Sequence, residues 1–307
     1  MKVIIGTRGS RLALAQAEYV RDILQNADAG HTFEIKIIST TGDRVTDRPL
    51  DQIGGRGLFV REIEQQLLSG EIQLAVHSMK DMPAELPEGL VFASTWQRED
   101  PRDVLVLREK HSLSELPQGA VIGTGSIRRQ ALLHRLRPDL RLTGIRGNVD
   151  TRLCRMQEDK LDGIVLAAAG MHRLGRQRQI TQYLSYEEMV PAPAQGALAL
   201  EVRRDDYDLQ QFLTRFADRE SEFAVKAERE FMRLCGGGCH MPVGAICRRM
   251  PEGHFHMRTV FGDRNGGHLV LSEVLGTDPV VMAREAASMY GMCELPVAQG
   301  EEIDGTK

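Results

Sequence analysis

Short apolar runs alternate with amphipathic segments through the first two hundred residues of this chain, which has 307 in all. The runs at residues 3–6, 104–107 and 163–167 have the length and apolar content of buried strands. Between such runs, residues 10–25 and 127–137 carry apolar side chains three and four positions apart, which predicts helices. This alternation is typical of βαβ units, so we expect an α/β fold with mainly parallel sheets.

One strand-to-helix turn occurs twice. Residues 4–10 read Ile-Ile-Gly-Thr-Arg-Gly-Ser and residues 121–126 read Val-Ile-Gly-Thr-Gly-Ser, each before a predicted helix. Such a turn presents free backbone N–H groups and a positive helix end, which together bind anions. One turn of this kind is common and means little, whereas two with arginines nearby favour paired α/β domains around a ligand-binding cleft.

The pattern changes near residue 221. A helix predicted over 222–234 is followed by three glycines before Cys239, then by short strand-like runs and a helix over 279–290. This pattern predicts a small α+β domain with an antiparallel sheet. We expect the polar tail at 299–307 to be disordered.

Charge and cysteine content narrow the function. The net charge is −4, yet residues 128–178 hold eleven arginines and one lysine against five acids, which favours an anionic ligand. Aromatic side chains are not interleaved with these arginines, so we expect no nucleic-acid partner. The longest apolar stretch, 164–169, is too short for a membrane span. Five cysteines without a CxxC spacing and a strand-like start without a signal peptide predict a reduced, cytoplasmic protein without structural zinc.

Two segments carry reactive side chains. His77, Ser78, Lys80 and Asp81 follow a buried strand, where α/β folds place function, although Lys80 and Asp81 can equally form a weak surface ion pair. A carboxylate beside cations stays ionised and can stabilise a cationic intermediate or move a proton. Cys239 is an attachment point, a buried apolar residue, or a nucleophile beside its neighbouring histidine. The Gly-rich, charged segment 43–57 predicts a mobile lid.

Together these motifs resemble the porphobilinogen deaminase family, also called hydroxymethylbilane synthases. The resemblance covers nearly the whole chain. The matching segments are GTRGS (6–10), GGRGLFV (54–60), AVHSMKD (75–81), REDPRD (98–103), GTGSIRRQ (123–130), IRGNV (145–149), PAQGA (193–197), AER (227–229) and GGC (237–239).

The resemblance implies two α/β domains built like periplasmic binding proteins, at 1–97 with 197–216 and at 101–191, plus an α+β cofactor-attachment domain at 219–307. It implies a cytoplasmic, monomeric transferase that joins four porphobilinogen molecules into hydroxymethylbilane and releases four ammonia molecules. The chain grows on a dipyrromethane cofactor held by a thioether to Cys239. The partner is the small-molecule substrate, with no metal, nucleic acid or membrane.

The resemblance also assigns the site residues. Asp81 is catalytic. The cofactor-binding residues are Cys239, Ser78, Lys80, Asp81, Thr124, Ser126, Arg128, Arg129, Arg146 and Arg152. The substrate-binding residues are Arg8, Ser10, Arg146, Arg152, Arg173 and Gln195.

Four positions depart from the family pattern. Arg56 and Gln52 stand where other members have lysines, Gly125 replaces a serine, and Cys235 is an additional thiol. We expect Arg56 and Gln52 to affect substrate affinity rather than the reaction, and Gly125 to remove one hydroxyl from the cofactor site. We expect Cys235 neither to compete for the cofactor nor to oxidise in a reducing cytosol. Two other functional classes remain open from the residues alone. A non-catalytic anion-binding protein leaves Asp81 and the glycine-cysteine loop unexplained, and a cysteine hydrolase leaves the arginines unexplained.

Overall fold

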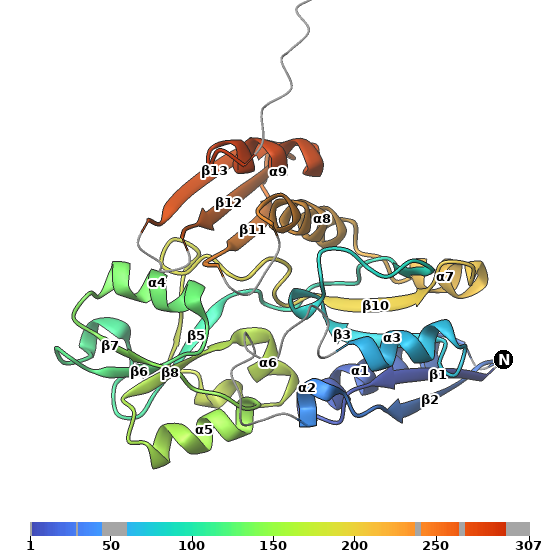
Figure 1. The fold of residues 1–307 in the computed structure, drawn as a ribbon, viewed down its shortest axis with the longest axis horizontal. Coiled ribbons are helices and arrows are strands. Elements are labelled where there is room, and N and C mark those ends of the chain that lie inside the picture. Colours follow the sequence, from blue (N-terminus) through green and yellow to red (C-terminus); the bar gives the residue numbers. More distant parts are fainter. Residues whose placement is uncertain (1, 29, 45–59, 237–240, 264–267, 293–307) are drawn as a thin grey trace, which may run out of the picture.

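The computed structural model describes residues 2–28, 30–44, 60–236, 241–263 and 268–292 (Figure 1). Most of the predicted lid, including Gln52 and Arg56, lies outside these residues, as do Cys239 with His240 and the tail 299–307. Across the described ranges, no helix combines the length and the apolar character needed to cross a membrane.

Within the described residues the chain forms two five-stranded sheets and one three-stranded sheet. The strands of the first sheet, in spatial order, are β2 (Thr32–Ile37), β1 (Lys2–Thr7), β3 (Leu74–Ser78), β10 (Leu198–Arg203) and β4 (Leu90–Phe92). The helices of this part are α1 (Arg11–Ala27), α2 (Thr41–Arg44), α3 (Arg61–Leu68) and α7 (Tyr207–Thr214).

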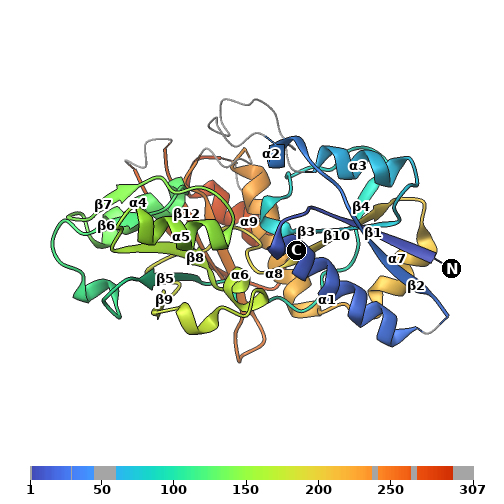
Figure 2. The same ribbon diagram turned by 90° about the horizontal axis from the view of Figure 1, so that it is seen from below.

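The second sheet has the same plan. Its strands, in spatial order, are β7 (Arg141–Thr143), β6 (Val121–Gly123), β8 (Gly163–Ala167), β5 (Asp103–Leu107) and β9 (Gln182–Tyr183). Its helices are α4 (Ile127–Leu136), α5 (Val149–Glu158) and α6 (Ala168–Arg173). Figure 2 shows the two sheets beside each other, with their helices around them.

The expectation of mainly parallel sheets is confirmed for four of the five strands in each sheet, but one strand in each is reversed, so both sheets are mixed. In the first, β1 runs parallel to β2 and β3, whereas β10 is antiparallel to β3 and β4. In the second, β6 runs parallel to β7 and β8, whereas β5 is antiparallel to β8 and β9. Each reversed strand follows a segment that crosses from one sheet to the other: the first crossing segment, residues 93–102, precedes β5, and the second crossing segment, residues 184–197, precedes β10. An apolar run identifies a buried strand but carries no information about its direction.

The C-terminal part is α+β with an antiparallel sheet, as predicted. Helix α8 (Arg219–Leu234) precedes three antiparallel strands, and α9 (Pro279–Ser288) follows them. The strands are β11 (Gly244–Arg249), β12 (Phe255–Phe261) and β13 (Val270–Gly276). This part lies above the junction of the two larger sheets in Figure 1.

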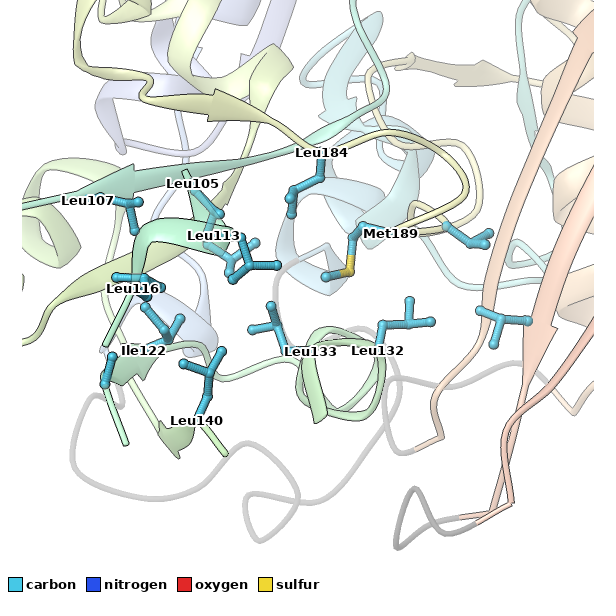
Figure 3. Close-up of a cluster of buried hydrophobic side chains, with 14 of the residues drawn as sticks. Leu105, Leu107, Leu113, Leu116, Ile122, Leu132, Leu133, Leu140, Leu184 and Met189 are labelled. Atoms are coloured by element: carbon cyan, nitrogen blue, oxygen red, sulfur yellow. The ribbon is translucent and has the colours of Figure 1, made fainter. Parts of the chain in front are cut away.

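One apolar core joins the second sheet to the C-terminal part. Leu105 of β5, Leu132 of α4 and Met189 pack together (Figure 3), and Ile246 of β11 and Val260 of β12 belong to the same cluster. Fully burying a side chain of this size stabilises a fold by about 1.5–3 kcal/mol. The arginine-bearing helix α4 is therefore held between the second sheet and the third.

Candidate active site

Asp81 lies just beyond the end of a buried strand, beside a small cavity. Strand β3 stops at Ser78, and a short 3₁₀ turn, η1 (Met79–Asp81), carries the chain to Pro83. The N–H of Met79 donates to the carbonyl of Ala197 (3.0 Å), which ties the turn to the chain entering β10. Asp81 is exposed, so its carboxylate faces the solvent side of this turn.

A small cavity of about 80 Å³ connects Asp81 with the first strand-to-helix turn. Its lining includes Arg8, Ser10, Gln16 and Ser78 besides Asp81. The hydroxyl of Ser10 accepts from the N–H of Ala13 and thereby caps α1. Since Gln16 Nε2 donates to Ser78 Oγ (2.9 Å), α1 is also fixed to the end of β3.

The second of the two repeated strand-to-helix turns, at 121–126, has the predicted helix cap. Ser126 Oγ accepts from the N–H of Arg129 and begins α4, as Ser10 begins α1. The buried Thr124 accepts from the N–H of Ser126 at 3.3 Å. The turn therefore places Thr124, Ser126, Arg128 and Arg129 together at the start of one helix.

Asp103, which sequence reasoning missed, lies between the two arginines. Its fully buried carboxylate accepts from Arg128 Nη1 (2.7 Å) and from Arg129 Nη2 (2.6 Å) and Nε (3.0 Å). Burial alone would raise the pKa of Asp103, but the charges of Arg128 and Arg129 hold it well below its usual range. The motif at 98–103 marked this segment, but nothing in it indicated which side chains Asp103 meets.

Gln195 connects Asp103 to Lys80. Its Nε2 donates to Asp103 Oδ1 (3.0 Å) and to the carbonyl of Pro101 (2.7 Å), while its Oε1 accepts from Lys80 Nζ (3.2 Å). Burial lowers the pKa of Lys80 to about 8, and the neighbouring charge of Asp81 opposes that shift. Gln195 is thus engaged with other side chains of the site.

Two further arginines, Arg146 and Arg152, lie at the start of α5, beside the second sheet. Arg152 follows Asn148, whose side chain caps α5, and its Nε donates to the carbonyl of Gly147 (2.8 Å). Burial lowers the pKa of Arg152 to about 10, and the charges of Arg129, Asp81 and Arg146 also act on it. Arg146 is exposed. These side chains therefore share one electrostatic environment with Asp81.

Arg173 is placed differently. It ends α6, and its Nη2 donates to the carbonyl of Gly196 (2.7 Å), within a segment that crosses between the sheets. Burial lowers its pKa to about 10. The described part of the chain places Arg173 beside Gly196 and Glu99 rather than beside Asp81.

The crossing segments are locked to each other. The N–H of Glu99 donates to the carbonyl of Gly196 (3.3 Å), and Gly196 has a φ of +91°. A Cβ at this position would overlap the carbonyl oxygen of Glu99, so the close approach requires glycine. Arg98 adds a bidentate ion pair with Glu228 of α8 (2.7 and 2.8 Å). No local pattern in the sequence predicts this junction beyond the motif itself.

The cluster suits a ligand with several carboxylates. Its cations, Lys80, Arg128, Arg129, Arg146 and Arg152, outnumber the carboxylates of Asp81 and Asp103. Arginine binds carboxylates in a bidentate geometry, and buried positive charge is stabilised by bound anions. The residues present therefore fit a polyanionic group such as dipyrromethane.

Three cysteines lie in the described part of the chain, and two of them are buried. Cys247 is buried on β11, and burial raises the pKa of its thiol well above the usual range. Cys235 ends α8 within the apolar core of the C-terminal part. Cys154 is exposed on α5. Cys239 remains the predicted attachment residue, outside the described residues.

Known proteins resemble this chain over most of its length. A family model described as "Porphobilinogen deaminase, dipyromethane cofactor binding domain" matches residues 3–211, and its C-terminal domain model matches 222–290. A porphobilinogen deaminase from Lachnospira eligens is 54% identical over 290 residues, covering 94% of this chain and 98% of that protein. The protein of that name from Geobacillus kaustophilus is 47% identical, covering 94% and 93%.

Solved structures give a weaker likeness. A periplasmic substrate-binding protein of an ABC transporter from Coxiella burnetii has a TM-score of 0.43 and 15% identity, covering 71% of this chain and 92% of that one. The BvgS periplasmic VFT2 domain from Bordetella pertussis has a TM-score of 0.39 and 19% identity, covering 69% and 84%. The family models and the relatives together establish that the chain belongs to the porphobilinogen deaminase family.

Proposed function

We propose that this chain is a transferase that joins four porphobilinogen molecules into hydroxymethylbilane, with release of ammonia, for porphyrin biosynthesis. The observation that carries the proposal is the placement of Asp81 beside Lys80, with Arg129 and Arg152 acting on the same site. Family membership supplies the reaction, and this cluster supplies groups that suit it.

The cations bind and orient carboxylates. Each porphobilinogen brings an acetate and a propionate, so a growing oligomer gains negative charge with every unit. Lys80, Arg128, Arg129, Arg146 and Arg152 would hold the carboxylates of dipyrromethane and of the oligomer. When bound, dipyrromethane supplies the primer to which new units are added. Arg8 and Ser10, at the cavity they share with Asp81, are suited to the incoming substrate.

Asp81 acts at the reacting centre in this proposal. Loss of ammonia from porphobilinogen creates positive charge on the pyrrole ring of that substrate. A carboxylate close to the ring nitrogen stabilises the charge, and it can accept the proton that leaves when the new bond has formed. The exposed position of Asp81 at the end of β3 gives a substrate access to it.

Attachment at Cys239 is part of the proposal. A thioether needs an accessible thiol, and Cys235 and Cys247 are buried in the core of the C-terminal part. Cys154 is exposed on α5, so it is the resemblance at residues 237–239, and not burial, that favours Cys239 over Cys154. We also propose domain bounds of 1–97 with 197–216, 101–191 and 219–307. The strands of the first sheet, which come from 2–92 and 198–203, support the discontinuous first domain.

The deciding experiment combines intact mass with turnover. The purified protein should carry a covalent excess of two pyrrole units and should release ammonia from porphobilinogen while forming hydroxymethylbilane. An unmodified chain that binds porphobilinogen without releasing ammonia would instead support the anion-binding alternative. Size-exclusion chromatography and cell fractionation would test the predicted monomer and its predicted cytoplasmic location.

A further inference from the structure

The buried carboxylate of Asp103 has no part in the reaction described above. It is the first residue of β5, directly after the crossing segment, and it contacts side chains from α4 and from the second crossing. We propose that Asp103 is a positioning residue: it fixes Arg128 and Arg129 on one side and, through Gln195, the ammonium group of Lys80 on the other. This inference rests on the proposed function and names a further residue needed by that site.

Asp103 fixes each arginine together with a backbone carbonyl. Arg128 Nη1 donates both to Asp103 and to the carbonyl of Val190 (2.6 Å). Arg129 donates to Asp103 through Nε and Nη2, and through Nη1 to the carbonyl of Val165 (2.9 Å). A guanidinium held at two points cannot rotate freely, so the orientation of both side chains is set before any ligand binds.

Asp103 also decides which end of Gln195 faces Lys80. A carboxylate and a carbonyl only accept hydrogen bonds, so Asp103 and Pro101 must both face the amide nitrogen of Gln195. The amide oxygen is then left to accept from Lys80 Nζ. In the flipped amide, the NH₂ group would face the ammonium, and neither group could accept.

The charge of Asp103 acts on Lys80 as well. The charged groups acting on this ammonium are Asp81 from η1, Asp103 from β5, and Arg128 and Arg129 from α4. Burial, with a contribution from the two arginines, lowers the pKa of Lys80, the two aspartates raise it, and together these effects leave it at about 8. Removing the negative charge of Asp103 therefore moves the titration of Lys80 to lower pH, closer to neutrality. Lys80 must stay protonated there if it is to bind a carboxylate.

A purely structural ion pair would behave differently, and Glu228 provides the comparison. Glu228 is also fully buried and also accepts two hydrogen bonds from an arginine, Arg98. It lies on α8 and accepts from the N–H of Ala194, next to Gln195, but its charge is not among those acting on Lys80. Loss of either carboxylate should weaken the fold, but only loss of Asp103 should change Lys80.

The experiment compares Asp103→Asn with Glu228→Gln in the full chain as purified. NMR titration of lysine labelled at its ε carbon follows Lys80, whose signal is identified by its loss in Lys80→Met. We expect Asp103→Asn to lower the Lys80 midpoint, shift the alkaline limb of ammonia release to lower pH, and reduce kcat at least ~10-fold. Glu228→Gln should lower the melting temperature and leave the midpoint unchanged.

An unchanged Lys80 midpoint in Asp103→Asn would overturn the proposal, and so would an equal shift in Glu228→Gln. If Asp103→Asn does not fold, Gln195→Met tests the same connection without a change of charge. We expect Gln195→Met to lower kcat and alter the Lys80 titration. A rise in KM alone would mean that Gln195 only contacts substrate, and would also overturn the proposal.

The outcome is separable from that of the proposed function. Failure of the wild-type protein to release ammonia from porphobilinogen would refute the proposed reaction. The Lys80 titration needs no substrate, so it tests the positioning by Asp103 in either case.

Discussion

Arg98 and Glu228 form a bidentate ion pair that joins the first crossing segment to helix α8, with N–O distances of 2.7 and 2.8 Å. Glu228 also accepts from the backbone N–H of Ala194, on the second crossing segment, and from that of Cys247 on β11. One carboxylate thus holds both crossings and the C-terminal sheet. The ion pair therefore stabilises the junction between the crossing segments and the C-terminal part.

We predict that Arg98→Met destabilises the protein by about 3–5 kcal/mol, because it leaves the buried charge of Glu228 uncompensated. Urea unfolding measures this change. The matched control is Arg233→Met, which removes a half-exposed partner of Glu230 on the same helix and should cost about 0–1 kcal/mol. Equal effects of the two substitutions would show that the junction is not specially stabilised by this pair.

Arg146 and Arg129 should respond differently to substitution by leucine. Arg146 is exposed, so Arg146→Leu should weaken binding of the polyanionic oligomer while the melting temperature stays within a few degrees. Arg129 is buried against Asp103, so Arg129→Leu should lower both binding and stability. Each lost charge-assisted contact to ligand is worth about 1.5–3 kcal/mol. A sharp fall in melting temperature for Arg146→Leu would contradict its assignment to ligand binding.

Cys239→Ser should give a folded protein that lacks the covalent cofactor, because a hydroxyl is a far weaker nucleophile than a thiolate. Intact mass after purification measures the loss. Cys235→Ser is the control, since that thiol lies in the apolar core and should not carry the cofactor. Loss of the two pyrrole units in Cys235→Ser would mean that Cys235, and not Cys239, carries the cofactor.

Asp81→Asn should fold, keep its cofactor and release ammonia at least ~100-fold more slowly, the scale expected when one electrostatic or proton-transfer group is lost. Single-turnover release of ammonia by the cofactor-loaded protein measures the rate. Asp81→Glu keeps the charge and moves it by about one methylene, so it should retain more activity than the asparagine variant. Near-normal rates in Asp81→Asn would move the search for the catalytic group elsewhere in the cleft.

The sequence predicted the elements of this fold better than their connections. Buried strands such as β3 and β8 are recognisable because each contains an unbroken run of apolar residues, 74–76 in β3 and 164–167 in β8. The serine caps at 10 and 126 were also readable, because a short polar side chain before an amphipathic segment begins a helix. The direction of β5 and β10 was not readable, since it depends on how the chain crosses between sheets.

The same limit applies to the site. Asp81 and its neighbours were identifiable because they lie together in the sequence, at the end of a buried strand. Asp103 meets Arg128 and Arg129 across about 25 residues and Gln195 across 92, so no local pattern joins them. In the sequence, Asp103 is the last residue of the charged motif 98–103 and resembles any surface acid. Only the folded structure shows that it is buried between Arg128 and Arg129.

A last prediction concerns pH and a buried acid away from the cations of the cleft. Glu64 of α3 is buried, and burial together with the charge of Glu201 raises its pKa to about 7. A carboxyl whose pKa is raised on folding favours the folded state below its unfolded pKa, and this contribution is lost as the pH rises through about 7. Glu64→Gln mimics the protonated form, so it should raise the melting temperature at pH 8 and change it little at pH 5. Thermal unfolding at the two pH values provides the measurement, with Glu71→Gln, an exposed acid, as the control. A stabilisation by Glu64→Gln that is equal at both pH values would mean that Glu64 does not titrate as its surroundings indicate.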